Sequence, residues 1–179
     1  FPVHVDSYPM PLWSLLEMIF RNLPSWLNFL IFCGIISWQA IYFNLLINRH
    51  DVLYKNSYLP AVVFVLFVSS APAFLVIHPL HFVNLILLRI FDKLFSLYKH
   101  DKGIVTIFDC GFLAALAALL YLPALPILFL LMIALSIMRP FNIREWLVLL
   151  IGYVIPVMFL SVYKFWNHEL LAFWESFFK

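Results

Sequence analysis

Long apolar stretches separated by short polar ones dominate the pattern along the chain. A helix that crosses the apolar core of a bilayer needs about 20 consecutive apolar residues, and several stretches approach that length. The pattern predicts an all-α fold, a polytopic transmembrane helical bundle of about six spans with interfacial helices at both ends. Gly111 and the alanines after it predict a tight hairpin of the fourth and fifth spans. We expect the spans at about 26–47, 58–77, 80–98, 104–122, 124–138 and 146–163.

The two ends of the chain flank the predicted bundle, 26–163, with more polar sequence. Residues 1–25 contain several prolines, and the stretch LWSLLEMIFRNL predicts a short interfacial helix on the outer face. Its expected apolar stripe consists of Leu12, Leu15, Leu16, Ile19 and Leu23. The tail, 164–179, alternates aromatic and charged residues, which predicts an interfacial segment with Trp166 and Trp174 near the lipid headgroups.

The segment HPLHFVNLILLRIFDKLFSLYKH, residues 78–100, either crosses the membrane or lies on its surface. The positive-inside rule places the excess of lysine and arginine in the cytoplasm. If the segment lies on the surface, the lysines and arginines divide seven to four between the two sides of the membrane. If it crosses, they divide eight to three, and the crossing arrangement is favoured because its excess on one side is larger. The eight are Arg49, Lys55, Arg89, Lys93, Lys99, Lys102, Arg139 and Arg144, and the three are Arg21, Lys164 and Lys179.

Among the ionisable residues inside predicted spans, three are candidate polar groups within the membrane: Arg89, Asp92 and Asp109. Arg89 and Asp92 are three residues apart on one helical face, so we expect them to pair and Arg89 to extend toward the interface. Asp109 lies five residues into its span, where an ionisable group is a functional hypothesis by default. The alternative is that Asp109 lies just below the interface and bonds to Thr106 or to a neighbouring arginine.

Two further sets of residues suggest ligand chemistry. Arg139 and Arg144 in MRPFNIREW could bind the phosphate of a lipid, or could simply fix the topology. His78 and His81, at i and i+3, could shuttle a proton or hold a metal, or be interfacial histidines satisfied by water. A metal would need further ligands, of which the candidates are His4, Asp6 and His168. We predict no metal site and no cofactor.

The composition supports a membrane protein, because 65% of the residues are hydrophobic and 11% are charged, whereas a soluble domain has about 25% charged residues. The net charge of +2, with scattered basic residues, argues against nucleic acid as a partner. Cys33 and Cys110 lie in apolar runs and are expected to behave as small hydrophobic residues. Glycine-rich phosphate loops and nucleophile motifs are absent from the sequence. The start at Phe1, without a signal-peptide pattern, suggests a piece of a longer protein.

From about Ile47 onward the sequence, including LINRHDVLYKNSYLPAVVFVLFVSSAPAF and IVTIFDCGFLAALAALLYLPALPILFLLMIALSIMRPFNIREW, resembles an uncharacterised polytopic inner-membrane protein family of Bacteroidota. The resemblance implies the bacterial inner membrane as location. More faintly, NLILLRIFDKLF, DCGFLAALAALLYLP and ALPILFLLMIAL are similar, in their order, to the membrane fold of polyprenyl-phosphate-sugar glycosyltransferases. That similarity implies a catalytic acidic residue on an outer loop, for which Asp6 is the candidate, although the paired acidic motif of that fold is not present.

These observations lead to three functional hypotheses. The first is a non-catalytic subunit or scaffold of a larger bacterial membrane complex, with membrane lipids and other membrane-protein subunits as partners. The second is a glycosyltransferase-like enzyme acting on a lipid-linked sugar at the outer face, with Asp6 as general base and His78 or His81 beside the phosphate of a polyprenyl-phosphate lipid. The third is a transporter, which would need a water path around Gln39, Ser69 and Ser70.

Overall fold

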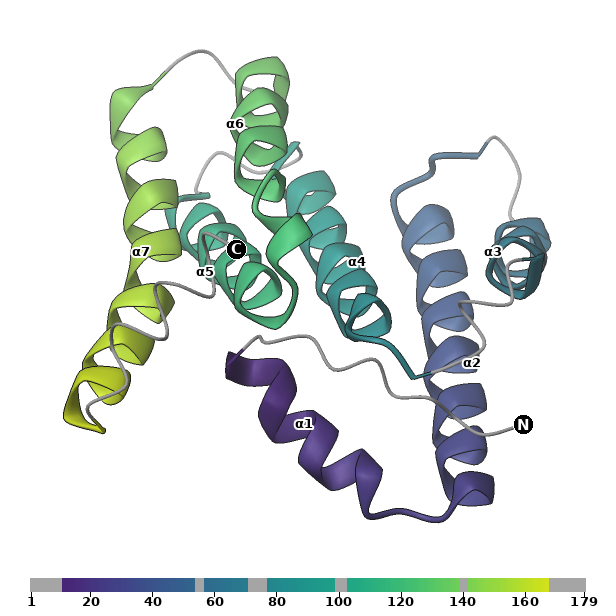
Figure 1. The fold of residues 1–179 in the computed structure, drawn as a ribbon. Coiled ribbons are helices and arrows are strands. Elements are labelled where there is room, and N and C mark those ends of the chain that lie inside the picture. Colours follow the sequence, from purple (N-terminus) through teal and green to yellow (C-terminus); the bar gives the residue numbers. More distant parts are fainter. Residues whose placement is uncertain (1–10, 54–56, 71–76, 99–102, 139–141, 168–179) are drawn as a thin grey trace.

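The computed structural model describes residues 11–53, 57–70, 77–98, 103–138 and 142–167 (Figure 1). Within these ranges the chain forms seven α-helices, one short 3₁₀ helix and no strand, so the predicted all-α fold is confirmed. The elements are α1 (Pro11–Arg21), α2 (Ser25–Arg49), α3 (Leu59–Ser70), α4 (Pro79–Tyr98), α5 (Ile104–Leu120), η2 (Leu122–Ala124), α6 (Ile127–Met138) and α7 (Ile143–Trp166).

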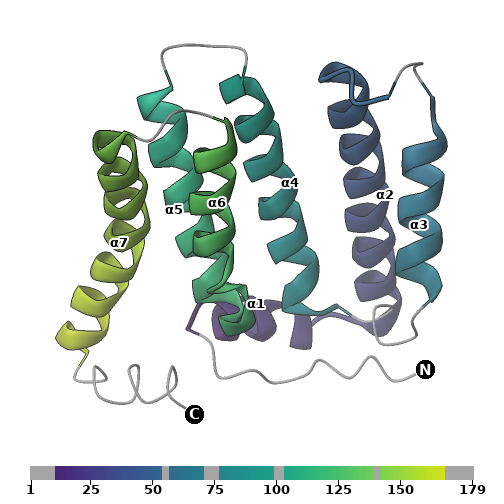
Figure 2. The same cartoon turned by 90° about the horizontal axis from the view of Figure 1, so that it is seen from above.

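The helices α2 to α7 run between two ends of the molecule in alternating directions (Figure 2). Helix α1 lies across one end, which we call the α1 end, and η2 lies at the same end. The opposite end, where α2 finishes at Arg49, is called the Arg49 end. Figures 1 and 2 both place α4 in the middle, with α2 and α3 on one side and α5, α6 and α7 on the other.

Two of the helices, α2 and α7, are long and apolar enough to cross a membrane. The shorter apolar helices are Leu59–Ser70, Ile104–Leu120 and the stretch Leu122–Met138. Helix α4 has 20 residues but contains Arg89, Asp92 and Lys93. Each of the six predicted spans overlaps one of these helices, but the crossing of a membrane by all six stays a prediction.

The start of α7 corrects one expected boundary. We expected the last span to begin near Trp146, but the helix begins at Ile143. Asn142 is its N-cap, with Oδ1 accepting a hydrogen bond from the backbone N–H of Arg144 at 3.1 Å. An N-cap asparagine followed three residues later by Glu145 is a helix-start pattern, so the sequence contained this signal.

Helix α1 packs on the bundle through Trp13 and Phe20 together with part of the predicted stripe, Leu12 and Leu16. Trp13 is fully buried and Phe20 is buried, while Ile19 is 59% exposed. The rings of Trp13 and Phe20 lie 6.1 and 6.0 Å from that of Phe82 in α4. The two aromatic residues determine the face that α1 turns to α4, and Ile19 lies outside that face. The interfacial position of α1 stays a prediction.

The closest helix approach is between α5 and α7, which corrects the expected tight α5–α6 hairpin. A Cβ added at Gly111 of α5 would collide with the carbonyl oxygen of Leu149 in α7. One added at Gly152 of α7 would collide with the carbonyl oxygen of Phe108 in α5. Small residues allow helix backbones to approach closely, as predicted, but the partner of α5 in this contact is α7.

Candidate functional site

Polar side chains meet where α2 faces α4. On α2 they are Gln39, Tyr42 and His50, of which the first and last are eleven positions apart, about three helical turns on one stripe. On α4 they are Asn84 and Asp92, eight positions apart on one face. We call this contact the α2–α4 seam.

The inner part of the seam is an amide pair. Gln39 is 0% exposed, and its Nε2 donates to the backbone carbonyl of His81 at 2.6 Å. Its Oε1 accepts from Nδ2 of Asn84 at 3.1 Å. Both ends of the buried amide are thus paired, as the low dielectric of a helix interface requires.

The outer part is a group that we call the Asp92 cluster, formed by Tyr42, Arg49, His50, Arg89 and Asp92. Asp92 accepts from the Tyr42 hydroxyl at 2.9 Å and from Nε2 of His50 at 2.9 Å. The Arg49 guanidinium is 3.7 Å from the same carboxylate. Arg89 donates to the Tyr42 hydroxyl at 3.0 Å and lies over the Tyr42 ring. The side chains of His50 and Asp92 are only 8% and 13% exposed.

This geometry corrects two expected pairings. Arg89 and Asp92 do not pair directly but are joined through Tyr42, which both of them contact. Asp109 bonds to Lys93 of α4, with Oδ2 2.7 Å from Nζ, rather than to Thr106 or an arginine. A helical face fixes the direction of a side chain, whereas its partner depends on which helix lies opposite.

The two histidines at the start of α4 have different surroundings. The His78 ring lies edge-on to Tyr121, with centroids 5.7 Å apart, and its Nδ1 accepts from the backbone N–H of Leu80. His81 is 6% exposed, and its ring is 5.3 Å from that of Phe32 in α2. The two imidazoles are therefore engaged with different elements.

The other predicted ligand residues do not gather in the described part of the chain. Among the residues that the structure describes, no group of three or more His, Cys, Asp or Glu side chains could hold a metal ion. Arg144 is exposed in the first turn of α7. His4, Asp6, Arg139 and His168 lie outside the described residues.

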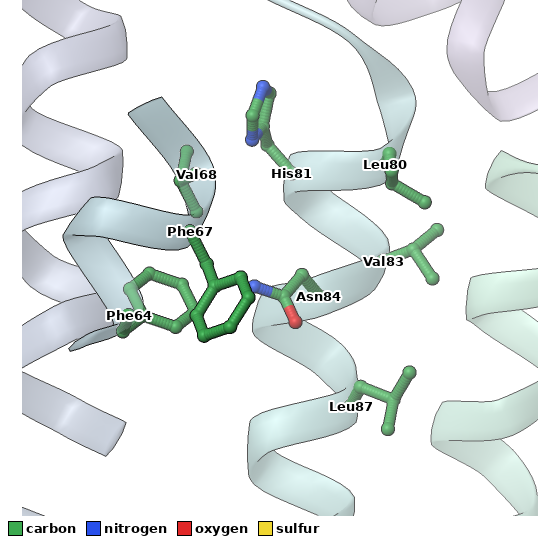
Figure 3. A pocket seen from close by; sticks show the side chains of 8 residues that line it. All are labelled: Phe64, Phe67, Val68, Leu80, His81, Val83, Asn84 and Leu87. Atoms are coloured by element: carbon green, nitrogen blue, oxygen red, sulfur yellow. The ribbon is translucent and has the colours of Figure 1, made fainter. Parts of the chain in front are cut away.

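Within the described residues, two cavities adjoin the amide pair of Gln39 and Asn84. One of about 140 Å³ touches Gln39, Tyr42 and Arg89, which is small against the roughly 300–1,000 Å³ of ordinary ligand pockets. The other, about 380 Å³, lies between α3 and α4 (Figure 3). Its walls are mainly apolar, and Figure 3 shows the Asn84 amide directed toward Phe67 of α3.

The residues of the expected water path are separated. Gln39 is enclosed between α2 and α4, whereas Ser69 and Ser70 are exposed on α3. The Ser70 hydroxyl donates to the carbonyl of Phe67 in its own helix, at 2.8 Å. These three residues therefore do not form one polar path in this structure.

Tyr42 and His50 were not identified from the sequence. The predicted first span ended at Ile47, with NRHD as a loop, but α2 continues to Arg49 and His50 is its C-cap. The available signal was the stripe of polar residues through an apolar run, from Gln39 to His50.

No family model matches the chain, and neither the curated proteins nor the solved structures contain a significant match. The fold and the seam define an all-α helical bundle held partly by interhelical polar contacts. The resemblances noted in the sequence remain predictions.

Proposed function

We propose that the chain is an integral protein of the bacterial inner membrane and a non-catalytic subunit or scaffold of a larger membrane complex. In this proposal α2 to α7 cross the bilayer, and the Arg49 end faces the cytoplasm. The α2–α4 seam holds the bundle together, while the outer helix faces contact lipids and partner helices.

The observation that carries the proposal is the inverted polarity of the bundle. Large apolar side chains are exposed along α2, α3, α6 and α7, whereas the amides and carboxylate of the seam face inward and are paired. Soluble monomers rarely expose contiguous apolar surface of more than a few hundred Å². Examples of the exposed residues are Phe29, Trp38, Leu66, Phe67, Phe129, Ile133, Ile151, Val154 and Phe159.

The non-catalytic part of the proposal rests on how the polar groups are used. Gln39 and Asp92, two enclosed polar side chains of the seam, are bonded to neighbouring helices. Such pairing stabilises helix contacts in a membrane, where an unpaired polar group is costly. The smaller cavity beside the amide pair, about 140 Å³, offers little room for a substrate. Among the described residues, no Asp, Glu, Lys or Arg side chain lines the larger one, about 380 Å³.

The runner-up remains a transferase acting on a lipid-linked sugar, with Asp6 as base and His78 or His81 beside the phosphate. Its histidines point to different neighbours, Tyr121 and Phe32. If this function is correct, Asp6→Asn abolishes an envelope-glycan phenotype without lowering protein abundance. Unchanged glycans would argue against it.

The experiment that tests the proposal uses the full-length tagged protein, expressed at its natural level. Its membranes are washed with alkaline carbonate, extracted in mild detergent and analysed by native mass spectrometry. We expect the protein to remain in the washed membranes and to be released with another membrane protein at constant stoichiometry. Release by carbonate would refute the membrane assignment, and a protein that is always alone would refute the subunit role. A bound polyprenyl-phosphate lipid would instead support the runner-up.

A further inference from the structure

A cavity of about 510 Å³ lies between α2 and α3 near the Arg49 end. This volume is within the range of ordinary ligand pockets. Its residues on α2 include Ile41, Leu45 and Arg49, and Tyr58 and Ala61 line it from the α3 side. None of these side chains belongs to the α1 end of the molecule.

The polarity of this cavity changes along its length. Ile41, Leu45 and Arg49 follow one another at intervals of four residues, which is about one helical turn each. Tyr58 lies at the start of α3, and Ala61 is about one turn further into the helix. The cavity therefore has a polar mouth at the Arg49 end and an apolar floor toward the middle of the bundle.

The mouth is fixed by contacts between the two helices. Asn48 and Ser57 exchange two hydrogen bonds of 3.4 Å, from Nδ2 to the Ser57 carbonyl and from the Ser57 N–H to Oδ1. The Ser57 hydroxyl also accepts from the backbone N–H of Leu59 at 3.1 Å. These bonds hold the start of α3 beside the last turn of α2, so the cavity is bounded on both sides.

Arg49 can bind an anion at this mouth. Its side chain is 62% exposed, and the nearest oxygen of Asp92 is 3.7 Å away, beyond hydrogen-bond distance. A guanidinium has five N–H donors in a fork that fits phosphate. The Asp92 cluster holds two guanidinium groups, from Arg49 and Arg89, against one carboxylate. Its positive charge therefore complements an anionic ligand.

Asn44 adds a polar group about one turn below Arg49. It lines the cavity and is 8% exposed, and its Oδ1 has no hydrogen-bond partner in the structure. Buried amide oxygens are normally paired, often through an ordered water.

We propose that this α2–α3 cavity binds an anionic phospholipid of the phosphatidylglycerol class. The phosphate contacts Arg49 and the Tyr58 hydroxyl, and an acyl chain lies on Ile41, Leu45 and Ala61. The match is between a charged head above an apolar chain and a cationic mouth above an apolar floor. This inference rests on the proposed membrane embedding and names a lipid site within it.

The test is lipid binding by the purified full-length protein in mild detergent, measured by native mass spectrometry. The probe is an equimolar mixture of phosphatidylglycerol and phosphatidylcholine with the same acyl chains. Arg49→Gln removes the guanidinium, and Ala61→Phe fills the floor without touching the Asp92 cluster. Arg21→Gln, at the α1 end, is the charge-matched control, and thermal unfolding of each variant verifies its fold.

We expect the wild type to prefer phosphatidylglycerol and Arg49→Gln to weaken its binding about tenfold, the effect of losing one charge-assisted hydrogen bond. Ala61→Phe should weaken both lipids, and Arg21→Gln neither. Equal binding of the two lipids, or unchanged binding in both cavity variants, overturns the proposal. If Arg144→Gln weakened phosphatidylglycerol binding and Arg49→Gln did not, the anion would bind at α7, which also overturns the proposal. Displacement by equimolar glycerol phosphate would show a headgroup site without an acyl chain, which also overturns it.

This result is separable from the test of the proposed function. Release of the protein from membranes by carbonate would refute the proposed function. A protein that stays in the membrane but has no Arg49-dependent lipid preference fails only the lipid site.

Discussion

At the residue scale, the arrangement around Asp92 shows how a carboxylate is accommodated within an apolar helix bundle. The desolvation of a buried carboxylate is costly unless the group is paired and hydrogen-bonded. Tyr42 and His50 supply hydrogen bonds of 2.9 Å, one to each carboxylate oxygen. The ring of Phe95 lies 5.3 Å from that of His50 and covers it. The Asp92 carboxylate is therefore bonded across the helix interface, to Tyr42 of α2 and to His50 at its C-cap.

Asp92→Asn should lower the stability of the protein in detergent by about 1–3 kcal/mol, because hydrogen bonds to a charged acceptor contribute about that much. Asp109→Asn is the matched control, since the Lys93–Asp109 pair has side chains 35% and 40% exposed and exposed pairs contribute little. Thermal unfolding followed by tryptophan fluorescence compares the two. Equal losses of stability in the two variants would show that the enclosure of Asp92 does not add to its contribution.

The coupling between Tyr42 and Asp92 can be measured separately. Tyr42→Phe removes the hydroxyl that donates to Asp92 at 2.9 Å, so we expect it to be destabilising in the wild type. In the Asp92→Asn background, Tyr42→Phe should lower the free energy of unfolding by less, because the charged acceptor is already lost. A double-mutant cycle of unfolding free energies gives the interaction term, and strict additivity would contradict the direct contact.

At the element scale, α4 connects the two halves of the bundle. Asp92 faces α2, and the adjacent Lys93 reaches Asp109 of α5. Consecutive helical residues point about 100° apart, so neighbouring charges can serve different helices. On the α5 side the contact is mainly apolar, with Ile90 and Leu94 buried against Ile107. The α2 side is the more polar contact of the two.

Two glycine substitutions should change the stability in opposite directions, because Gly111 lies in the α5–α7 contact and Gly34 does not. Gly111→Ala places a methyl group against the Leu149 carbonyl, a backbone atom that can move only with its helix, so we expect a loss of about 1–3 kcal/mol. Gly34→Ala on α2 meets nothing within 4 Å, and should stabilise by up to about 1 kcal/mol through helix propensity. Unfolding in detergent measures both, and a neutral Gly111→Ala would mean that the helices are not in close contact.

At the scale of the whole molecule, apolar side chains are exposed and the seam is internal, as expected for a bundle in lipid. The two ends also differ, with α1 lying across one end and the Asp92 cluster close to the other. The sequence left open whether residues 78–100 cross the membrane. The alternating directions of α2 to α7 favour the crossing arrangement, which makes a specific prediction of sidedness.

Single cysteines test this topology in a background with Cys33 and Cys110 replaced by alanine. Val52→Cys follows α2 and Ile143→Cys begins α7, and both positions are exposed. If α3, α4, α5 and α6 all cross, a membrane-impermeant maleimide labels both from the same side. Labelling from opposite sides would mean that one of the helices α3 to α6 does not cross. Helix α4, which contains Arg89, Asp92 and Lys93, would be tested first. Ile133→Cys, exposed within α6, should resist labelling while the membrane is intact.

The helices themselves were predictable to a large extent. Helix formation depends on local sequence, and long apolar runs ended by prolines or polar residues mark the helices even without a known partner. The end of α2 was less predictable, because His50 at its C-cap resembles a loop residue. The start of α7 was missed although Asn142 and Glu145 form a helix-start pattern. Boundary errors of this kind concealed His50 as a member of the site.

The sequence by itself determined that the fold is all-α, where its helices lie approximately, and that apolar residues far outnumber charged ones, because these follow from composition and periodicity. Only the tertiary structure decided which residues meet. Asp92 bonds to Tyr42 and His50, fifty and forty-two positions away, and Gly111 packs on α7 rather than α6. Helical periodicity fixes the direction in which a side chain points, but the packing of the helices determines its partner.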